Sequence, residues 1–244
     1  MLRGTANAVL KAIDKKLLTV SAILVAAGSS SRMNGTDKLF ADLRGEPVLA
    51  ATLKVFQQSR SVQEIVLVVK KEWVEQAQAL CRMHGADKVT AVLPGGATRS
   101  ESSGIGLGAV TKKADIVLIH DGDRPFVDQD MIFRTVDAAA KWGAATAAIP
   151  VSSTIKRGKE GAVTETVSRD GLFEIQTPQA FQADLLKAAR KRAGKEGRTF
   201  TDDCAFLEDM GIRPVLVDGS RLNLKITYPE DLVLARAIAG MKEG

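Results

Sequence analysis

The sequence predicts an α/β fold in which a mainly parallel sheet is covered by helices on both faces. Short apolar runs recur along the chain, and stretches with helical periodicity separate them. Strands that alternate with helices of about 10 to 15 residues are typical of parallel strands joined by crossover helices. The chain has 244 residues, of which 45% are hydrophobic, so it can bury a sizeable core.

Six apolar runs define the expected strands. The first run, VSAILVAAG at 20–28, is too short to span a membrane and ends in small residues, which indicates a buried parallel strand. We expect this strand at the centre of the sheet. The other five expected strands are at 64–69, 90–93, 115–120, 145–151 and 213–217.

Helical periodicity fills the intervals between these strands. The expected helices are at 47–58, 73–83, 100–110, 128–142, 184–193 and 202–210. A final helix begins in the segment TYPE. There Thr227 is expected to cap the first turn, Glu230 to reach back as a capping box, and Pro229 to occupy the first turn.

Residues 152–173 interrupt the alternation. Two short extended stretches, STIKR and AVTETVS, flank the Gly-rich charged turn RGKEG, which predicts a β-hairpin arm that leaves the domain. An isolated two-stranded hairpin is only marginally stable in water, so we expect this arm to pack against a second copy of the chain. Residues 20–244 would form one domain, and residues 1–19 an accessory extension with no chemistry, a short helix at most.

Composition excludes several classes of protein. The net charge of +5 comes from mixed signs without a run of five basic residues, which suits a small anionic ligand and indicates no nucleic-acid partner. Cys81 and Cys204 lie far apart and match no metal-binding spacing, which fits a reducing cytoplasm. No apolar run approaches roughly 18 residues, and residues 1–19 lack a signal core, so we expect neither membrane association nor export.

A small-residue loop follows the first expected strand. It comprises Ala26, Ala27 and Gly28, then three serines and Arg32, with Lys38 close behind. Small residues let the backbone approach a ligand, and exposed N–H groups with two cations make an anion cradle. An ordinary tight turn with solvated cations explains the same residues, and neither a Walker nor a GxGxxG pattern fits.

The segment GIGLGA at 104–109 does match the dinucleotide pattern GxGxxA. The polar stretch TRSESS precedes it in place of a strand, so the context of a dinucleotide site is missing. We interpret Gly104, Gly106 and Gly108 as positions of close helix packing.

The motif HDGDRP ends the strand expected at 115–120. The carboxyl ends of parallel strands form the ligand-binding edge of open α/β sheets. Asp121 is therefore a candidate for binding a ribose hydroxyl, a substrate hydroxyl or a metal, and Arg124 for binding a phosphate. A capped turn with a surface ion pair is the alternative. His120 is expected to be structural, because no Ser or Cys nucleophile motif accompanies it.

Three further polar positions stand out. QTPQ at 176–179 follows the arm, and TDD at 201–203 opens a helix, where a cap alone explains Thr201 and Asp202. Lys225 lies in the apolar, strand-like run NLKIT. A lysine there is costly unless it faces a cleft or an anion, which makes it a functional candidate.

Taken together, these motifs resemble one family. AAGSSSRM with KLF, GGATRSESS, HDGDRPF, STIKRG, QTPQAF, TDD and GSRLNLKITYPEDL occur in the order of the 2-C-methyl-D-erythritol 4-phosphate cytidylyltransferases of isoprenoid precursor synthesis. The resemblance covers about residues 20–240. It implies a Rossmann-like nucleotidyltransferase fold, a homodimer joined through the arm, and transfer of CMP from CTP to methylerythritol phosphate. Mg²⁺ would be bound mainly by the triphosphate.

The resemblance also implies roles for single residues. The CTP triphosphate would lie on the loop at 27–32, and the CTP-binding positions would be Ala26, Ala27, Gly28, Gly95, Ser102 and Asp121. Methylerythritol phosphate would contact Asp121, Arg124, Thr177, Thr201 and Lys225, with Thr154 and Arg169 supplied by the partner's arm. The catalytic positions would be Arg32, Lys38, Arg169 and Lys225. We expect Arg32 and Lys38 to face solvent in the empty protein. No general base is needed, because the substrate phosphate is already ionised.

Three positions depart from the family pattern. Ser30 replaces a usual glycine. Gly122-Asp123 replaces the Ala-Ala or Ala-Val pair of the family motif HDAARP or HDAVRP, and Ser153 replaces the aspartate of DTIKR. The carboxylate of Asp123 either faces away from the phosphate site or alters metal binding. The alternatives are a ribitol-5-phosphate cytidylyltransferase and a non-catalytic nucleotide-binding module. The segments TDDCAFLEDMG and GSRLNLKITYPEDLVLA favour the methylerythritol phosphate enzyme over the ribitol phosphate enzyme. Retention of Arg32, Lys38 and Lys225 argues against an inactive module.

Overall fold

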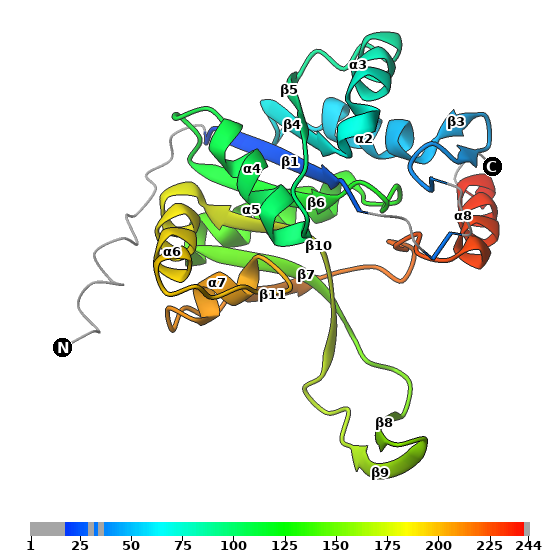
Figure 1. Ribbon diagram of the computed structural model, residues 1–244, viewed down its shortest axis with the longest axis vertical. Helices are drawn as coiled ribbons and strands as arrows, with labels where there is room; N and C mark the ends of the chain where they lie inside the picture. The colour runs from blue at the N-terminus through cyan, green and yellow to red at the C-terminus, as the bar shows by residue number, and fades with distance from the viewer. Residues whose placement is uncertain (1–17, 29–31, 34–36, 242–244) are drawn as a thin grey trace.

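A computed structural model describes residues 18–28, 32–33 and 37–241. Its centre is a seven-stranded sheet with the order β11-β7-β10-β6-β1-β4-β5 (Figure 1). The strands are β1 (Val20–Ala26), β4 (Glu64–Val69), β5 (Val89–Pro94), β6 (Ile116–Asp121), β7 (Ala144–Pro150), β10 (Phe173–Gln182) and β11 (Val215–Asp218). All the pairs are parallel except those that β10 makes with β6 and β7. The predicted mainly parallel sheet is therefore confirmed.

The strand β1 lies inside the sheet, between β6 and β4, as expected. Every one of its residues is buried. Successive side chains of a strand point to opposite faces, so Leu24 joins one apolar cluster and Ile23 and Val25 join the other. This continuous apolar run needs cover on both sides of the sheet, which helices provide.

Helices cover both faces, as predicted. On one face lie α2 (Val48–Gln58), α3 (Val74–Met83) and α5 (Gln129–Trp142), and on the other α4 (Arg99–Ala109), α6 (Ala183–Lys195) and α7 (Cys204–Glu208). The strands β2 (Asp42–Leu43) and β3 (Glu46–Pro47) and the 3₁₀ turn η1 (Lys71–Trp73) connect them. Each expected helix is present, although α7 is shorter than the stretch predicted for it. None of the helices in the described part of the chain is long and apolar enough to cross a membrane.

The sequence analysis did not find β10, which pairs antiparallel with β6 and β7. Its polar residues Gln176, Thr177 and Gln179 are buried and hydrogen-bonded, so the strand lacks the apolar alternation that marks the others. Thr146 on β7, for example, donates from its hydroxyl to the carbonyl of Gln176 at 3.2 Å. Conversely, the run NLKIT forms no strand in the structure.

The C-terminal helix α8 (Pro229–Met241) begins where the sequence predicts, but its cap differs. The carboxylate of Asp231 accepts hydrogen bonds from the backbone N–H groups of Thr227 and Tyr228. The hydroxyl of Thr227 instead donates to the carbonyl of Lys225. The predicted cap by Thr227 and Glu230 is therefore wrong. Because the helix starts at Pro229, the position that reaches back falls one residue later than expected.

The glycines of the GxGxxA segment lie within α4. A Cβ at Gly106 would stand 2.4 Å from Cγ2 of Ile23, so the predicted close packing against the sheet is confirmed there. At Gly104 a Cβ would meet the Arg190 guanidinium, whereas at Gly108 it would meet nothing within 4 Å. The interpretation is wrong for Gly108.

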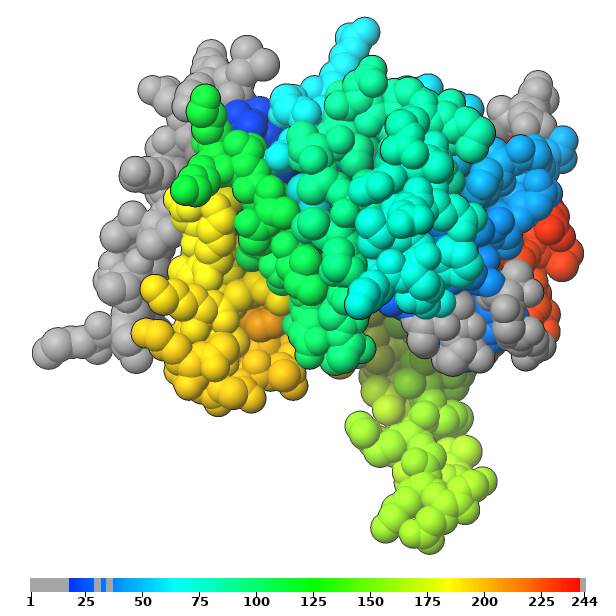
Figure 2. Space-filling view, turned by 45° about the horizontal axis from the view of Figure 1, so that its top comes forward, coloured from blue at the N-terminus to red at the C-terminus, as the bar shows by residue number. Residues whose placement is uncertain are grey.

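The predicted hairpin arm is present as β8 (Ile155–Lys159) and β9 (Ala162–Val167), which pair only with each other. Glu160 and Gly161 both have positive φ angles, 53° and 81°, as in the two-residue turns that suit hairpins. Figures 1 and 2 show the arm projecting from the body of the protein. Nearly all its side chains are exposed, apart from the half-buried cross-strand pair Ile155 and Val167.

Candidate active site

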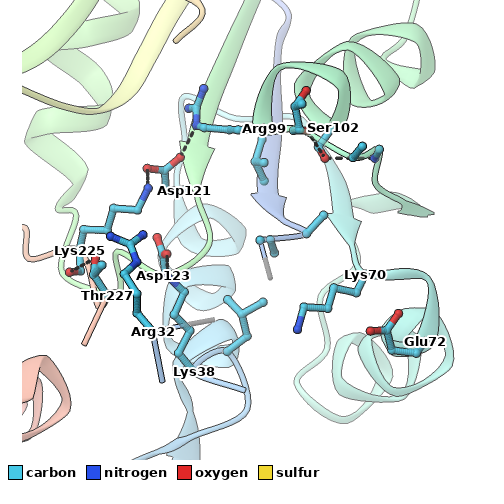
Figure 3. A pocket seen from close by; sticks show the side chains of 18 residues that line it. Arg32, Lys38, Lys70, Glu72, Arg99, Ser102, Asp121, Asp123, Lys225 and Thr227 are labelled. Atoms are coloured by element: carbon cyan, nitrogen blue, oxygen red, sulfur yellow. Dashed lines mark hydrogen bonds and ion pairs between the residues drawn. The ribbon is translucent and has the colours of Figure 1, made fainter. Parts of the chain in front are cut away.

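A cavity of about 500 Å³ lies at the carboxyl ends of β1, β4 and β6 (Figure 3). Open α/β sheets bind ligands at this edge. Eight of the residues that the sequence singled out line it together, namely Ala26, Ala27, Gly28, Arg32, Lys38, Ser102, Asp121 and Lys225. Residues 29–31, including Ser30, lie outside the described residues.

Sequence reasoning gave no role in a ligand site to four other lining residues: Lys70, Glu72, Arg99 and Thr227, the last of which was expected only to cap a helix. Lys70 follows β4 directly, and its ammonium lies 2.8 Å from the carboxylate of Asp37. The rule that ligands bind beyond the carboxyl ends of parallel strands would have pointed to it. Arg99 opens α4, in a segment that was used for the resemblance and to dismiss the GxGxxA match, without a role for the arginine.

Two loops approach each other closely on one side of the cavity. A Cβ at Gly95 would come within 2.3 Å of the Ala27 side chain and 2.7 Å of the Ser102 hydroxyl. Ser102 is buried, accepts a hydrogen bond from the N–H of Gly96 and donates to the carbonyl of Thr98. These hydrogen bonds fix the loop to α4, and Gly95 lets the loop pack against Ala27 at the end of β1. Only glycine fits at residue 95.

Arg32 is exposed, as expected. Its guanidinium carbon lies 5.3 Å from the ring centroid of Tyr228, which is a cation–π distance. Tyr228 is itself half exposed. The guanidinium is therefore held at the edge of the cavity by a contact that a phosphate can replace at low cost.

Lys38 is not solvent-facing, and the expectation that it would be is wrong. Only 8% of the residue is exposed. Its ammonium lies 2.5 Å from Oδ2 of Asp123 and donates a hydrogen bond of 2.8 Å to the carbonyl of Ile226. A lysine can be buried in this way because the carboxylate compensates its charge and both contacts accept from its N–H groups. Asp123 accordingly faces into the site and not away from it (Figure 3).

Asp121 is buried at the end of β6 among three cations. Its Oδ1 accepts from Arg99 Nε at 2.9 Å, and its Oδ2 lies 2.8 Å from Lys225 Nζ and 3.6 Å from Arg124 Nε. Burial alone would raise the pKa of Asp121, but the charges of Arg99, Lys225 and Arg124 outweigh it and hold that pKa well below the usual range. The carboxylate is thus ionised and orients the cations around it.

Arg99 connects Asp121 to a second buried carboxylate. Its Nη1 donates to Oδ2 of Asp203 at 2.7 Å, while Oδ1 of Asp203 accepts from Arg190 and from the hydroxyl of Ser103. Burial opposes the charged form, but Asp121 and Asp203 outweigh it and raise the pKa of Arg99. This network joins the start of α4 to the TDD segment before α7.

His120 is fully buried, as its structural role requires. Its Nε2 lies 3.1 Å from the carbonyl of Arg124, which can only accept, so Nε2 carries the proton. Nδ1 then accepts from the Thr177 hydroxyl at 3.0 Å, and that hydroxyl accepts from the N–H of Asp121. Burial lowers the pKa of His120 to about 4, so the ring is neutral at pH 7.

The remaining predicted residues lie outside the cavity lining. Arg124 is nearly buried and donates to the carbonyl of Asn223 at 2.8 Å. Thr177 is buried, and its hydroxyl is engaged within the chain. Thr201 is exposed, and the neighbouring Asp202 accepts a hydrogen bond from the N–H of Ala205 in the first turn of α7.

Thr154 and Arg169 belong to the arm and do not line the cavity of their own chain. Both are exposed, and Arg169 donates a hydrogen bond to the carbonyl of Ser152 at the base of the arm. The structure therefore brings together the residues expected after β1 and β6 with Ser102 and Lys225, and leaves the two arm residues apart from them.

Comparisons with known proteins identify the family. Residues 20–241 match the model of the family described as 2-C-methyl-D-erythritol 4-phosphate cytidylyltransferase. The enzyme of that name from Dehalococcoides mccartyi is 42% identical over 226 residues, covering 92% of this chain and 97% of its own. The one from Halalkalibacterium halodurans is 42% identical over 224 residues, covering 91% and 98%.

Solved structures give the same result. A 4-diphosphocytidyl-2C-methyl-D-erythritol synthase from Anaerococcus prevotii is similar with a TM-score of 0.81 and 30% identity, covering 92% of this chain and 97% of that one. A 2-C-methyl-D-erythritol 4-phosphate cytidylyltransferase from Thermus thermophilus is similar with a TM-score of 0.78 and 32% identity, covering 91% and 100%.

Proposed function

The chain belongs to the 2-C-methyl-D-erythritol 4-phosphate cytidylyltransferase family, and we propose that the cavity at the carboxyl edge of the sheet is its active site. The reaction transfers CMP from CTP to methylerythritol phosphate and releases pyrophosphate. The observation that carries the proposal is the charge of the lining. Arg32, Lys38, Lys70, Arg99 and Lys225 face three carboxylates there, which leaves a surplus of positive charge for a triphosphate and a phosphate.

The triphosphate would lie against the loop after β1, between Arg32 and Lys38. Nucleotidyl transfer depends mainly on positioning and on fixed positive charge around the reacting phosphorus. Lys38 suits this role because the ion pair and the hydrogen bond to Ile226 fix its ammonium before the ligand arrives. Lys70, which also lines the cavity, adds a further cation that the sequence analysis did not consider.

The cytosine would occupy the narrow space where the loop at 95–98 meets Ala26 and Ala27. Ser102 ties the loop at 95–98 to α4, and the absence of a side chain at Gly95 lets that loop pack against Ala27, so backbone groups there have fixed positions. A base that is recognised by fixed polar groups is discriminated strongly, because a wrong base leaves those groups unpaired. Gly28 and Asp121 would complete the nucleotide site, next to the ribose and triphosphate.

Methylerythritol phosphate would bind beside Asp121, with Lys225 and Arg124 as its cations. Lys225 and Arg124 both lie next to Oδ2 of Asp121, and this carboxylate keeps the two cations in place in the empty protein. Thr177 would act through the backbone N–H of Asp121, since its own proton goes to His120. Thr201 would contact the polyol directly, and Thr154 and Arg169 would come from a partner's arm.

The reaction would be a direct displacement. An oxygen of the methylerythritol phosphate attacks the α-phosphorus of CTP, a new P–O bond forms, and the bond between the α- and β-phosphates breaks to release pyrophosphate. The attacking phosphate needs no deprotonation at neutral pH, since its second pKa is about 6. The buried residue His120 is neutral, and both of its ring nitrogens are hydrogen-bonded within the chain, so it is not placed to act as a base.

The site suits a Mg²⁺ ion that is bound mainly by the triphosphate. Among the described residues, no group of three or more His, Cys, Asp or Glu side chains forms a metal cage. The carboxylate of Asp121 is occupied by cations, whereas Oδ1 of Asp123 has no hydrogen-bond partner among the described residues. Mg²⁺ is usually held by one or two carboxylates together with substrate phosphates. When bound, it would neutralise charge on the phosphates and orient them.

Three further proposals concern the whole protein. Residues 20–244 would form one domain, with residues 152–173 as a dimerisation arm, supported by the exposure of nearly every side chain there. Residues 1–19 would be an accessory extension, although 1–17 lie outside the described residues. The protein would work in the cytoplasm, which fits its two free, buried cysteines.

The experiment is a substrate panel with purified protein. Pyrophosphate release is measured with CTP and methylerythritol phosphate, then with ATP or GTP in place of CTP, and with ribitol phosphate in place of methylerythritol phosphate. We expect release with the first pair and much less with each replacement. Equal rates with ribitol phosphate would assign the protein to the alternative substrate.

A further inference from the structure

Asp123 occupies a position where the family motif carries a small apolar residue, and it is fixed inside the cavity. Only 6% of the residue is exposed. Its carbonyl accepts from the N–H of Ile226 at 2.9 Å, and its Oδ2 pairs with Lys38 at 2.5 Å. Its Oδ1 is buried and accepts no hydrogen bond from any described residue. A buried carboxylate oxygen without a partner is costly and requires an explanation.

The position of this carboxylate is unfavourable for a bare triphosphate. The nucleotide must bring several negative charges to Lys38, the same ammonium that Asp123 already neutralises. Metal-free CTP therefore meets both like-charge repulsion and competition for the lysine. Those interactions are strong because both side chains are about nine-tenths buried, at 10% and 9% exposure.

The same carboxylate is favourable when the nucleotide carries a divalent cation. Carboxylate oxygens combined with substrate phosphates are the usual ligands of Mg²⁺. Of the three carboxylates that line the cavity, Asp121 is engaged by cations and Glu72 is exposed, whereas Asp123 has a buried oxygen that no described residue uses. Its Oδ1 would then gain the partner that it lacks.

We propose that Asp123 makes nucleotide binding depend on a divalent cation, with Oδ1 as a protein ligand to the metal that CTP carries. Without the cation, the carboxylate opposes the triphosphate, so the site selects the metal complex of CTP over free CTP. This inference rests on the proposed function, because it takes CTP as the ligand of the cavity. Asp123 would thus replace a neutral position of the family by a metal-selecting one.

The test measures CTP binding by calorimetry without methylerythritol phosphate, so that no turnover occurs. Dissociation constants are obtained in Mg²⁺ and in EDTA for the wild type, for Asp123→Asn, and for Glu72→Gln as a matched control that removes a carboxylate from the same cavity. We expect the ratio of the EDTA constant to the Mg²⁺ constant to fall by about tenfold or more in Asp123→Asn. This variant should also bind metal-free CTP more tightly than the wild type does. Glu72→Gln should keep the wild-type ratio.

Two results would overturn the inference while leaving the proposed function intact. The first is an equal ratio in the wild type and Asp123→Asn. The second is an equal weakening of both forms of CTP, which would reduce Asp123 to a positioning residue for Lys38. If Asp123→Asn does not fold, Asp123→Glu supplies the readout, because retention of the carboxylate should retain the ratio and loss of the ratio contradicts the proposal. Failure of the wild type to bind CTP in either buffer would instead refute the nucleotide site itself.

Discussion

Lys38→Met should destabilise the protein, and the buried ion pair determines by how much. The two side chains are 10% and 9% exposed and 2.5 Å apart. Removing one partner of such a pair leaves a buried, uncompensated charge, which typically costs about 3–5 kcal/mol. The hydrogen bond to Ile226 is lost as well, while the methionine side chain recovers some apolar packing. We expect a net loss of about 3 kcal/mol, or roughly 6–12 °C in Tm for a chain of this length.

The assay is thermal and urea unfolding followed by circular dichroism at one fixed protein concentration. The double variant Lys38→Met/Asp123→Asn removes both charges, so it should be more stable than Lys38→Met alone by at least about 1.5 kcal/mol. Arg32→Met, which removes an exposed cation from the same cavity, should stay within about 0.5 kcal/mol of the wild type. If Lys38→Met is as stable as Arg32→Met, or if the two substitutions at Lys38 and Asp123 simply add, the argument from the buried pair is refuted.

Three further predictions concern catalysis, assembly and pH. Lys38→Ala and Arg32→Ala should each lower kcat by about two to three orders of magnitude in a pyrophosphate assay, and an unchanged kcat would remove that residue from the mechanism. When inactive Arg32→Ala and Arg169→Ala chains are unfolded together and refolded, about half the dimers should be mixed. One of the two sites in each mixed dimer is then intact, so about a quarter of wild-type activity should return, and no return after verified mixing would exclude a shared site. Burial lowers the pKa of His120 to about 4, so the unfolded chain binds the extra proton between about pH 6.5 and pH 4. The free energy of unfolding should therefore fall by up to about 3 kcal/mol as the pH is lowered across that window, and by less in His120→Asn. Equal pH slopes for the wild type and His120→Asn would contradict this assignment.

Apolar pattern made most of the fold predictable. The strand β4 and the helices α2 to α6 follow from runs whose period matches their structure, and the arm follows from its turn residues. The strand β10 was not predictable in this way, because four of its seven buried residues, Gln176, Thr177, Gln179 and Gln182, are polar and form hydrogen bonds with other segments of the chain. The cap of α8 was also mispredicted, because Asp231 and not Glu230 accepts the hydrogen bond from the N–H of Thr227.

Motifs identified the site residues more fully than they identified the contacts between them. Arg32 and Asp121 were named because charged residues after strands suit ligands, and Lys225 because a lysine in an apolar run is costly unless it faces a cleft or an anion. All three line one cavity. The burial of Lys38 was not foreseen, because it depends on Asp123 and on the carbonyl of Ile226, 188 residues away in sequence. Contacts at such separation exist only once the chain is folded. Arg99 was overlooked for the same reason, as its partners Asp121 and Asp203 lie on other segments.

An isotope experiment tests the central claim most directly, namely that the cavity joins the phosphate of methylerythritol phosphate to the α-phosphorus of CTP. The reaction is run with methylerythritol phosphate whose phosphate carries ¹⁸O in its non-ester oxygens, and both products are analysed by mass spectrometry. Direct attack by that phosphate predicts that 4-diphosphocytidyl-methylerythritol retains all the label and that the pyrophosphate contains none. Labelled pyrophosphate, loss of label from the nucleotide product, or no product at all would contradict the account.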